Sequence, residues 1–159
     1  MIETYTSIHI HLIWSTWDRL PILTADVEPD IHGLIVNECH RLRAFVAAIG
    51  GTDDHVHLLV GMPPTVTIAD LAKQVKGASS YVVNRNLFGD RAFRWQGAYG
   101  AFSVSPPDVA TVADYIRRQR EHHATGRIIR SLEWHSDTNP TGGVAAPSER
   151  MRVPAEAGR

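Results

Sequence analysis

AFVAAIGGTDDHVHLLV, residues 44–60, is the stretch that decides the fold of this chain. Its two ends, residues 44–51 and 55–60, are runs of apolar and β-branched side chains, and the Thr-Asp-Asp at 52–54 between them is a turn signal. Two such runs joined by so short a link predict a β-hairpin. Pro63 and Pro64 end the second strand, because proline cannot donate the backbone hydrogen bond that a strand needs.

A strand and a helix are expected on each side of this hairpin. Residues 4–14 alternate their side chains as a strand does, and residues 25–43 place apolar side chains three and four apart, which predicts an amphipathic helix. After the hairpin, a helix is expected over residues 67–84, followed by a short strand within residues 93–105. The order β-α-β-β-α-β predicts an α+β, ferredoxin-like fold, an antiparallel sheet with helices on one face.

The composition is that of one globular domain. The chain has 159 residues, of which 43% are hydrophobic and 21% charged. We expect the domain to span residues 1–134, and residues 135–159, which lack an apolar period, to form a flexible tail. The only cysteine, Cys39, excludes a disulfide within the chain and a cysteine-based zinc cluster.

The location of the protein is expected to be the cytoplasm, with no membrane as a partner. No apolar run approaches the ~18 residues that a membrane span needs, and the first residues lack the basic segment of a signal peptide.

Charge is distributed unevenly along the chain. The formal net charge is -1, but residues 1–72 hold 3 basic and 9 acidic side chains, whereas residues 73–130 hold 10 basic and 4 acidic ones. Such asymmetry indicates a polyanionic partner. Arginines that merely keep helix faces in contact with solvent would give the same charge pattern, so charge alone leaves both interpretations open.

His55 and His57 are the first candidate ligands. Residues two apart on a strand project from the same face, so the two imidazoles should lie side by side and could hold a divalent cation. The intervening and following apolar residues would face the opposite side, against the first two helices. A similar pair, His9 and His11, occurs in the first strand, and hydrogen-bonded structural histidines are the alternative for either pair.

A third helix is expected from Asp108 to about residue 123, after Pro106 and Pro107. Its apolar stripe leaves Tyr115 and Gln119 on a neighbouring flank, so Tyr115 is predicted to lie outside the core. Because the two residues are four apart, a phenol and an amide oxygen should face the same point in space. A partly exposed structural tyrosine is the alternative.

Several other chemistries lack their sequence signatures. The chain has no Gly-x-x-x-x-Gly-Lys-Ser/Thr loop for a nucleotide, no Gly-x-Ser-x-Gly elbow and no His-Glu-x-x-His pair.

Four segments, taken together in order and spacing, resemble one known family. They are Asp54-His-Val-His-Leu-Leu59, then Pro63-Pro-Thr with Lys76-Gly-Ala-Ser-Ser80, then Trp95-Gln-Gly-Ala-Tyr-Gly-Ala-Phe-Ser-Val-Ser105, and Tyr115-Ile-Arg-Arg-Gln-Arg-Glu-His-His123. In these residues the chain resembles the single-tyrosine HUH transposases of small bacterial insertion sequences, the IS200-like family. The resemblance covers residues 5–125.

The resemblance implies a homodimeric enzyme with a ferredoxin-like fold that cuts and rejoins single-stranded DNA at hairpin-containing element ends. It implies that His55, His57 and Gln119 bind Mg²⁺ or Mn²⁺. It also implies that Tyr115 is the nucleophile and forms a 5′-phosphotyrosine intermediate.

Basic side chains are the candidates for contact with the DNA backbone. Those expected to neutralise phosphates lie on the second helix, in the segment after it and near the nucleophile: Lys73, Lys76, Arg85, Arg91, Arg94, Arg117, Arg118 and Arg120.

One departure and two alternatives accompany this hypothesis. The family's first strand commonly ends Ser-Thr-Lys-x-Arg, and here Trp17 takes the place of the lysine in Ser15-Thr-Trp-Asp-Arg19. One alternative is a protein that keeps the fold and binds hairpins or single strands without catalysis. The other is a small hydrolase with its metal at His9 and His11.

Overall fold

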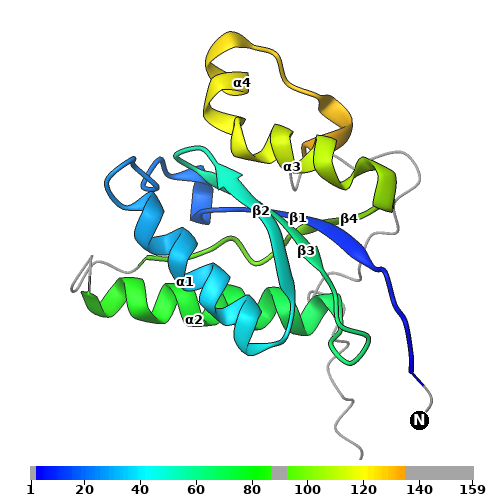
Figure 1. Cartoon of the computed structure of the whole chain (residues 1–159). Helices are drawn as coiled ribbons and strands as arrows, with labels where there is room; N and C mark the ends of the chain where they lie inside the picture. Colours follow the sequence, from blue (N-terminus) through cyan, green and yellow to red (C-terminus); the bar gives the residue numbers. More distant parts are fainter. Residues whose placement is uncertain (1–2, 87–92, 135–159) are drawn as a thin grey trace, which may run out of the picture.

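The structure is a computed structural model that describes residues 3–86 and 93–134 (Figure 1). The expected tail, residues 135–159, and Arg91 therefore lie outside the described residues. The main elements are β1 (His9–Ser15), α1 (Glu28–Arg41), β2 (Phe45–Gly51), β3 (His55–Gly61), α2 (Ile68–Asn86), β4 (Gly100–Val104), α3 (Val109–Arg117) and α4 (Gln119–Thr125).

The four strands form one antiparallel sheet in the order β2-β3-β1-β4. This order and the sequence β1-α1-β2-β3-α2-β4 confirm the predicted ferredoxin-like fold. The first strand begins at residue 9 and not at residue 4. His9 pairs with the last residue of β3 and the last residue of β4, so the residues before it have no strand to pair with.

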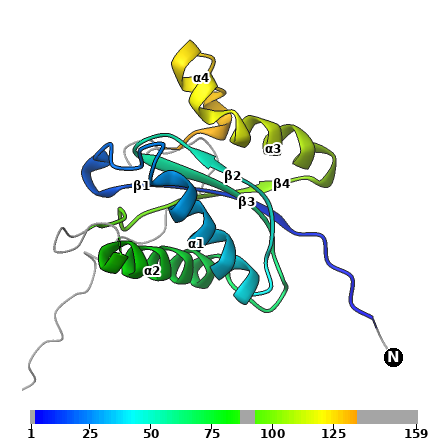
Figure 2. The same cartoon turned by 60° about the vertical axis from the view of Figure 1, so that its left-hand side comes forward.

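The main core lies on the face of the sheet that α1 and α2 cover (Figure 2). Alternate residues of the two central strands point into it, among them Leu12 and Trp14 from β1 and Val56 and Leu58 from β3. Thr67 begins α2 as expected, because its hydroxyl accepts a hydrogen bond from the backbone N–H of Asp70. None of the described helices is long and apolar enough to cross a membrane.

The other face of the sheet carries α3 (Figure 2). Val112, Ala113 and Ile116 pack there against β2 and β3 in a small second cluster. The helix comes so close to β2 that a Cβ on Gly50 would lie 2.0 Å from the carbonyl oxygen of Ile116. Glycine is therefore required at this position for α3 to reach the sheet.

The third predicted helix is not continuous. It breaks at Arg118, where φ is -104° and ψ is 22°, into α3 and α4. Gly126 then ends α4 in the left-handed conformation, with φ at 69°, and the backbone N–H of Arg127 bonds to the carbonyl of His122. The chain turns back here, and we call residues 127–134 the return segment.

Candidate active site

His55 and His57 lie side by side on the face of the sheet opposite the main core, as their spacing predicts. Both side chains are buried, and their ring centroids are 5.1 Å apart. The Nε2 atom of each ring has no hydrogen-bond partner among the described residues. The two Nε2 atoms are therefore free to bind a further group.

The Nδ1 atoms of the two rings are both held. Nδ1 of His55 donates to the Asp54 carboxylate at 2.7 Å, and Nδ1 of His57 lies 2.9 Å from Nε2 of His11. Burial alone would raise the pKa of the Asp54 carboxyl, but the hydrogen bond and charge of His55, with Arg19 nearby, hold this pKa well below its usual range. A charged carboxylate thus fixes the tautomer of His55 and turns its Nε2 lone pair toward the site.

Tyr115 reaches the same place from α3. Its ring centroid is 6.4 Å from that of His57 and 4.6 Å from that of His122, on which it stacks. The prediction that Tyr115 lies outside the core is wrong about its exposure, because only 3% of the residue is exposed. The reason is the return segment, which covers this flank of the helix and which helical spacing alone does not reveal.

Gln119 is the first residue of α4, one turn after Tyr115, and is 1% exposed. Its Oε1 atom has no hydrogen-bond partner among the described residues, and its Nε2 donates to Glu133 at 3.3 Å. The expected convergence of a phenol, an amide and two imidazoles is therefore present within a single subunit.

Glu133, in the return segment, is the residue that sequence reasoning missed. Its Oε1 accepts a 2.5 Å hydrogen bond from the Tyr115 hydroxyl. Its Oε2 lies 3.3 Å from Nε2 of His57 and 3.9 Å from Nε2 of His55, within ion-pair distance but without the alignment of a hydrogen bond at either ring. One sequence signal could have identified it: Glu133 is the only acidic residue between Glu121 and Asp137.

The charge of this carboxylate follows from its neighbours. Burial alone would raise the pKa of Glu133, but the polar contact with His57, together with the Tyr115 hydroxyl, lowers it to about 2. The pKa of the Tyr115 phenol shifts in the opposite direction, because burial and then the Glu133 carboxylate raise it to about 12. At neutral pH the site therefore holds a carboxylate and a protonated phenol.

This donor set fits a divalent cation. The ligand atoms of His55, His57 and Glu133 all lie within 4.8 Å of one another. In addition, the unpartnered Nε2 and Oε1 atoms of the two histidines and Gln119 are buried acceptors that an ion would satisfy. Two imidazoles with oxygen donors suit Mn²⁺ at least as well as Mg²⁺.

The His9–His11 pair forms no comparable centre. Within the described part of the chain, only His55, His57 and Glu133 bring three histidine, cysteine or acidic side chains together in this way. His11 instead contacts His57, so it belongs to the surroundings of the same site.

The arginines near Tyr115 are engaged within the fold. Arg117 donates to the carbonyl of Ala47, and Arg118 pairs with Glu121 and Asp114. Arg120 bonds to Glu28, Asp53 and the carbonyl of Leu23, which ties α4 to α1 and to the turn of the hairpin. Their role in DNA binding stays a prediction.

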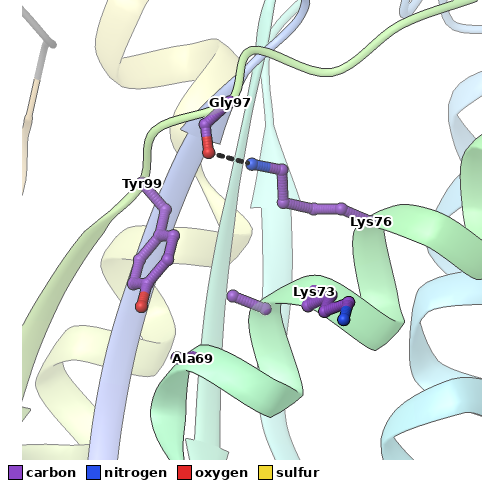
Figure 3. Close-up of a pocket in the computed structure, with 6 residues that line it drawn as sticks. Ala69, Lys73, Lys76, Gly97 and Tyr99 are labelled. Carbon is purple, nitrogen blue, oxygen red and sulfur yellow. Dashed lines mark hydrogen bonds between the residues drawn. The ribbon is translucent and has the colours of Figure 1, made fainter. Parts of the chain in front are cut away.

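The remaining basic candidates lie around α2 and the segment that follows it. Lys76 donates to the carbonyls of Gln96 and Gly97, and burial lowers its pKa to about 8 (Figure 3). It lines a pocket of about 290 Å³ together with Lys73 and Tyr99, and α2 lies on the sheet face opposite the histidines. Arg85 bonds to the exposed Tyr81.

Trp17, which takes the place of the family's lysine after the first strand, contacts Arg94. The guanidinium of Arg94 lies 4.1 Å from the centroid of its indole, which is a cation–π contact.

Comparison with known proteins adds a family. Residues 4–119 match the family model described as "Transposase IS200 like". The transposases for insertion sequence element IS200 of Salmonella typhimurium and Salmonella typhi are each 29% identical over 82 residues, which cover 48% of this chain and 53% of the relative. The chain thus spans about half the length of the curated relatives it matches.

Two solved structures resemble the chain in fold. A candidate transposase from Deinococcus radiodurans R1 superposes with a TM-score of 0.59 at 25% identity, covering 73% of this chain and 94% of the other. A REP-associated tyrosine transposase bound to a REP hairpin gives 0.55 at 14% identity, covering 93% and 98%. The matched region of the family model includes both histidines, Tyr115 and Gln119, and ends before Glu133.

Proposed function

The chain belongs to the family of IS200-like transposases, and from this premise we propose that it cleaves and rejoins single-stranded DNA through a phosphotyrosine at Tyr115. The observation that carries the proposal is the buried cluster in which Glu133 contacts the Tyr115 hydroxyl, the Gln119 amide and the unpartnered Nε2 atoms of the two histidines. Such a cluster combines a nucleophile with the ligands of a Lewis acid.

The metal would be held by His55 and His57, with Gln119 and Glu133 as the oxygen donors. A divalent ion bound there would withdraw charge from the scissile phosphate and orient it. The carboxylate of Glu133 links the two parts of the site, because one oxygen faces the histidines and the other accepts the phenol proton in a hydrogen bond.

The chain's own part in the reaction begins at the Tyr115 oxygen. It attacks phosphorus, the bond to the 3′ oxygen breaks, and a 5′-phosphotyrosine and a free 3′-hydroxyl result. The phenol proton leaves toward Glu133 and is balanced by the proton that the departing 3′ oxygen gains. Attack by another 3′-hydroxyl on the phosphotyrosine rejoins the DNA and regenerates the phenol. The phosphotyrosine keeps the energy of the broken phosphodiester bond, so the reaction needs no nucleotide cofactor such as ATP.

Access to Tyr115 requires the first part of the return segment, residues 127–131, to move while Glu133 stays at the site. The phenol oxygen is covered by Glu133 and by the backbone N–H of Ile129, at 3.1 Å. Residues 127–131 are all exposed, including Ile128 and Ile129, whereas Leu132 and Trp134 pack on the sheet side. Opening of residues 127–131 alone therefore exposes little apolar surface and is expected to cost little free energy.

The partner we propose is single-stranded DNA with a hairpin, bound by a homodimer in the cytoplasm. The fold that the chain shares with a transposase bound to a REP hairpin supports this choice of partner. Arg118 and Arg120 already form ion pairs with carboxylates, and Arg117 bonds to a backbone carbonyl. Lys73, Arg85 and Arg94 pair with no carboxylate of the described residues, so we take these three as the phosphate contacts.

The test is the covalent adduct. Tyr115→Phe should abolish cleavage of labelled single strands from the element ends in Mn²⁺, and should abolish the protein–DNA band on a denaturing gel, while binding in a gel shift persists. Tyr81→Phe, at an exposed tyrosine of α2, is the matched control and should form the adduct normally.

Two outcomes count against the proposal. Adduct formation by Tyr115→Phe would assign the nucleophile elsewhere. Salt-dependent DNA binding by the unmodified protein with no adduct under any metal condition would favour the alternative, a binding protein that keeps the fold without the reaction.

A further inference from the structure

His11 contacts the proposed metal site only through His57. It is fully buried in the central strand β1, where its backbone pairs with Leu59 of β3 and Phe102 of β4. Its Nε2 lies 2.9 Å from Nδ1 of His57, the two rings are nearly parallel with centroids 5.1 Å apart, and its own Nδ1 has no partner among the described residues. Two central strands thus fix both rings.

The two histidine ligands differ in what holds their Nδ1 atoms. A carboxylate, Asp54, can only accept, so it fixes the proton of His55 on Nδ1. An imidazole can donate or accept, so His11 permits two arrangements of His57. Both rings are fully buried, which favours their neutral forms, and a neutral imidazole carries a single proton.

The two arrangements have opposite consequences for metal binding. If Nε2–H of His11 donates, the proton of His57 is on its Nε2 and points toward Glu133, which blocks ligation. If Nδ1–H of His57 donates, Nε2 of His57 presents a lone pair to the site, and the proton of His11 is on its own Nδ1. Each imidazole keeps one proton in both arrangements, so conversion releases none.

We propose that His11 is a positioning residue that accepts a hydrogen bond from Nδ1 of His57 and thereby commits Nε2 of His57 to the metal. This inference rests on the proposed function, because it takes His57 to be a ligand. It also gives His11 a role in the site, and gives none to His9. Outer-shell partners of this kind typically contribute about 10–100-fold to metal affinity.

The test measures binding of Mn²⁺ alone to the full chain, by the electron paramagnetic resonance signal of free Mn²⁺. His11→Phe keeps an aromatic ring but removes the acceptor, and should weaken Mn²⁺ binding about 10–100-fold. His11→Gln restores an acceptor and should recover most of the affinity. His9→Phe, two residues away on the same face, has no described hydrogen bond to lose and should bind Mn²⁺ like the unmodified protein.

A spectroscopic measurement covers the case in which His11→Phe does not fold. In the ¹⁵N-labelled unmodified protein saturated with Mg²⁺, Nδ1 of His57 should carry the proton and show a scalar coupling across the hydrogen bond to Nε2 of His11. A His57 ring without a proton on Nδ1 in the metal-bound protein overturns the inference.

The outcomes separate the inference from the function it rests on. If the unmodified protein binds Mn²⁺ and a folded His11→Phe binds it equally well, the positioning role is wrong and the metal site stands. If the unmodified protein binds no Mn²⁺ or Mg²⁺, the proposed metal site fails and the role of His11 fails with it.

Discussion

Glu133 connects the hydroxyl of Tyr115, the proposed nucleophile, to the histidines through a single carboxylate. Its two oxygens separately face the Tyr115 hydroxyl and Nε2 of His57, and only 8% of its side chain is exposed. Carboxylates placed beside two imidazoles are common ligands of divalent transition metals. At the scale of the residue, the proposed metal site thus includes a side chain outside the region that the family model matches.

Replacing Glu133 with glutamine tests this dependence. The change keeps the size of the side chain but removes its charge, so Mn²⁺ affinity should fall by at least about tenfold, with adduct formation falling in parallel. Isothermal titration with Mn²⁺ and a denaturing gel measure the two effects. Glu121→Gln, at an exposed carboxylate paired with Arg118, is the control and should bind Mn²⁺ normally. Unchanged affinity in Glu133→Gln would leave Gln119 as the oxygen ligand.

At the scale of the element, the strands and the first two helices could be predicted because their patterns are local. The spacing of His55 and His57 on β3 put both imidazoles on one face, and the turn at residues 52–54 gave the hairpin. The break at Arg118, the burial of Tyr115 and the role of Glu133 could not be predicted. The burial of Tyr115 and the place of Glu133 depend on the return segment packing across α3, which no periodicity in residues 127–134 indicates. The break at Arg118 has no glycine or proline in residues 116–120 to signal it.

The approach of α3 to the sheet gives a prediction for the element. Gly50→Ala would place a Cβ 2.0 Å from the backbone oxygen of Ile116, so α3 must shift, and we expect a loss of about 1–3 kcal/mol in the free energy of unfolding. Mn²⁺ binding should weaken as well, because α3 carries Tyr115 and leads to Gln119. Chemical denaturation and metal titration measure these effects.

Gly33→Ala is the matched control for this change. A Cβ at Gly33, in α1, would meet nothing within 4 Å, so the same substitution should stabilise the protein by about 0.5–1 kcal/mol. Equal stability of the two variants would contradict the close approach at Gly50.

At the scale of the whole molecule, the two faces of the sheet carry different groups of side chains. One face, with α1 and α2, holds most of the apolar core, while the other holds the polar cluster beneath α3 and the return segment. Polar ligands with unpartnered atoms are costly in a core. Placing them on the second face, where the exposed residues 127–131 form part of the cover, keeps that cost local and leaves the site able to open.

Hydrogen exchange can measure this opening directly. The amide of Ile129, which donates to the Tyr115 hydroxyl, should exchange much faster than the amides of β1 and β3 in the free protein. Adding a single strand that carries the cleavage site, with Mg²⁺, to the Tyr115→Phe variant, which cannot react, should speed exchange across residues 127–131 relative to the same variant without DNA, while amides of α1 and α2 stay unchanged. The phosphate must displace these residues before it can reach the Tyr115 side chain. If residues 127–131 become as protected as β3 when DNA is bound, Tyr115 stays enclosed in the complex, and a tyrosine nucleophile at this position is wrong.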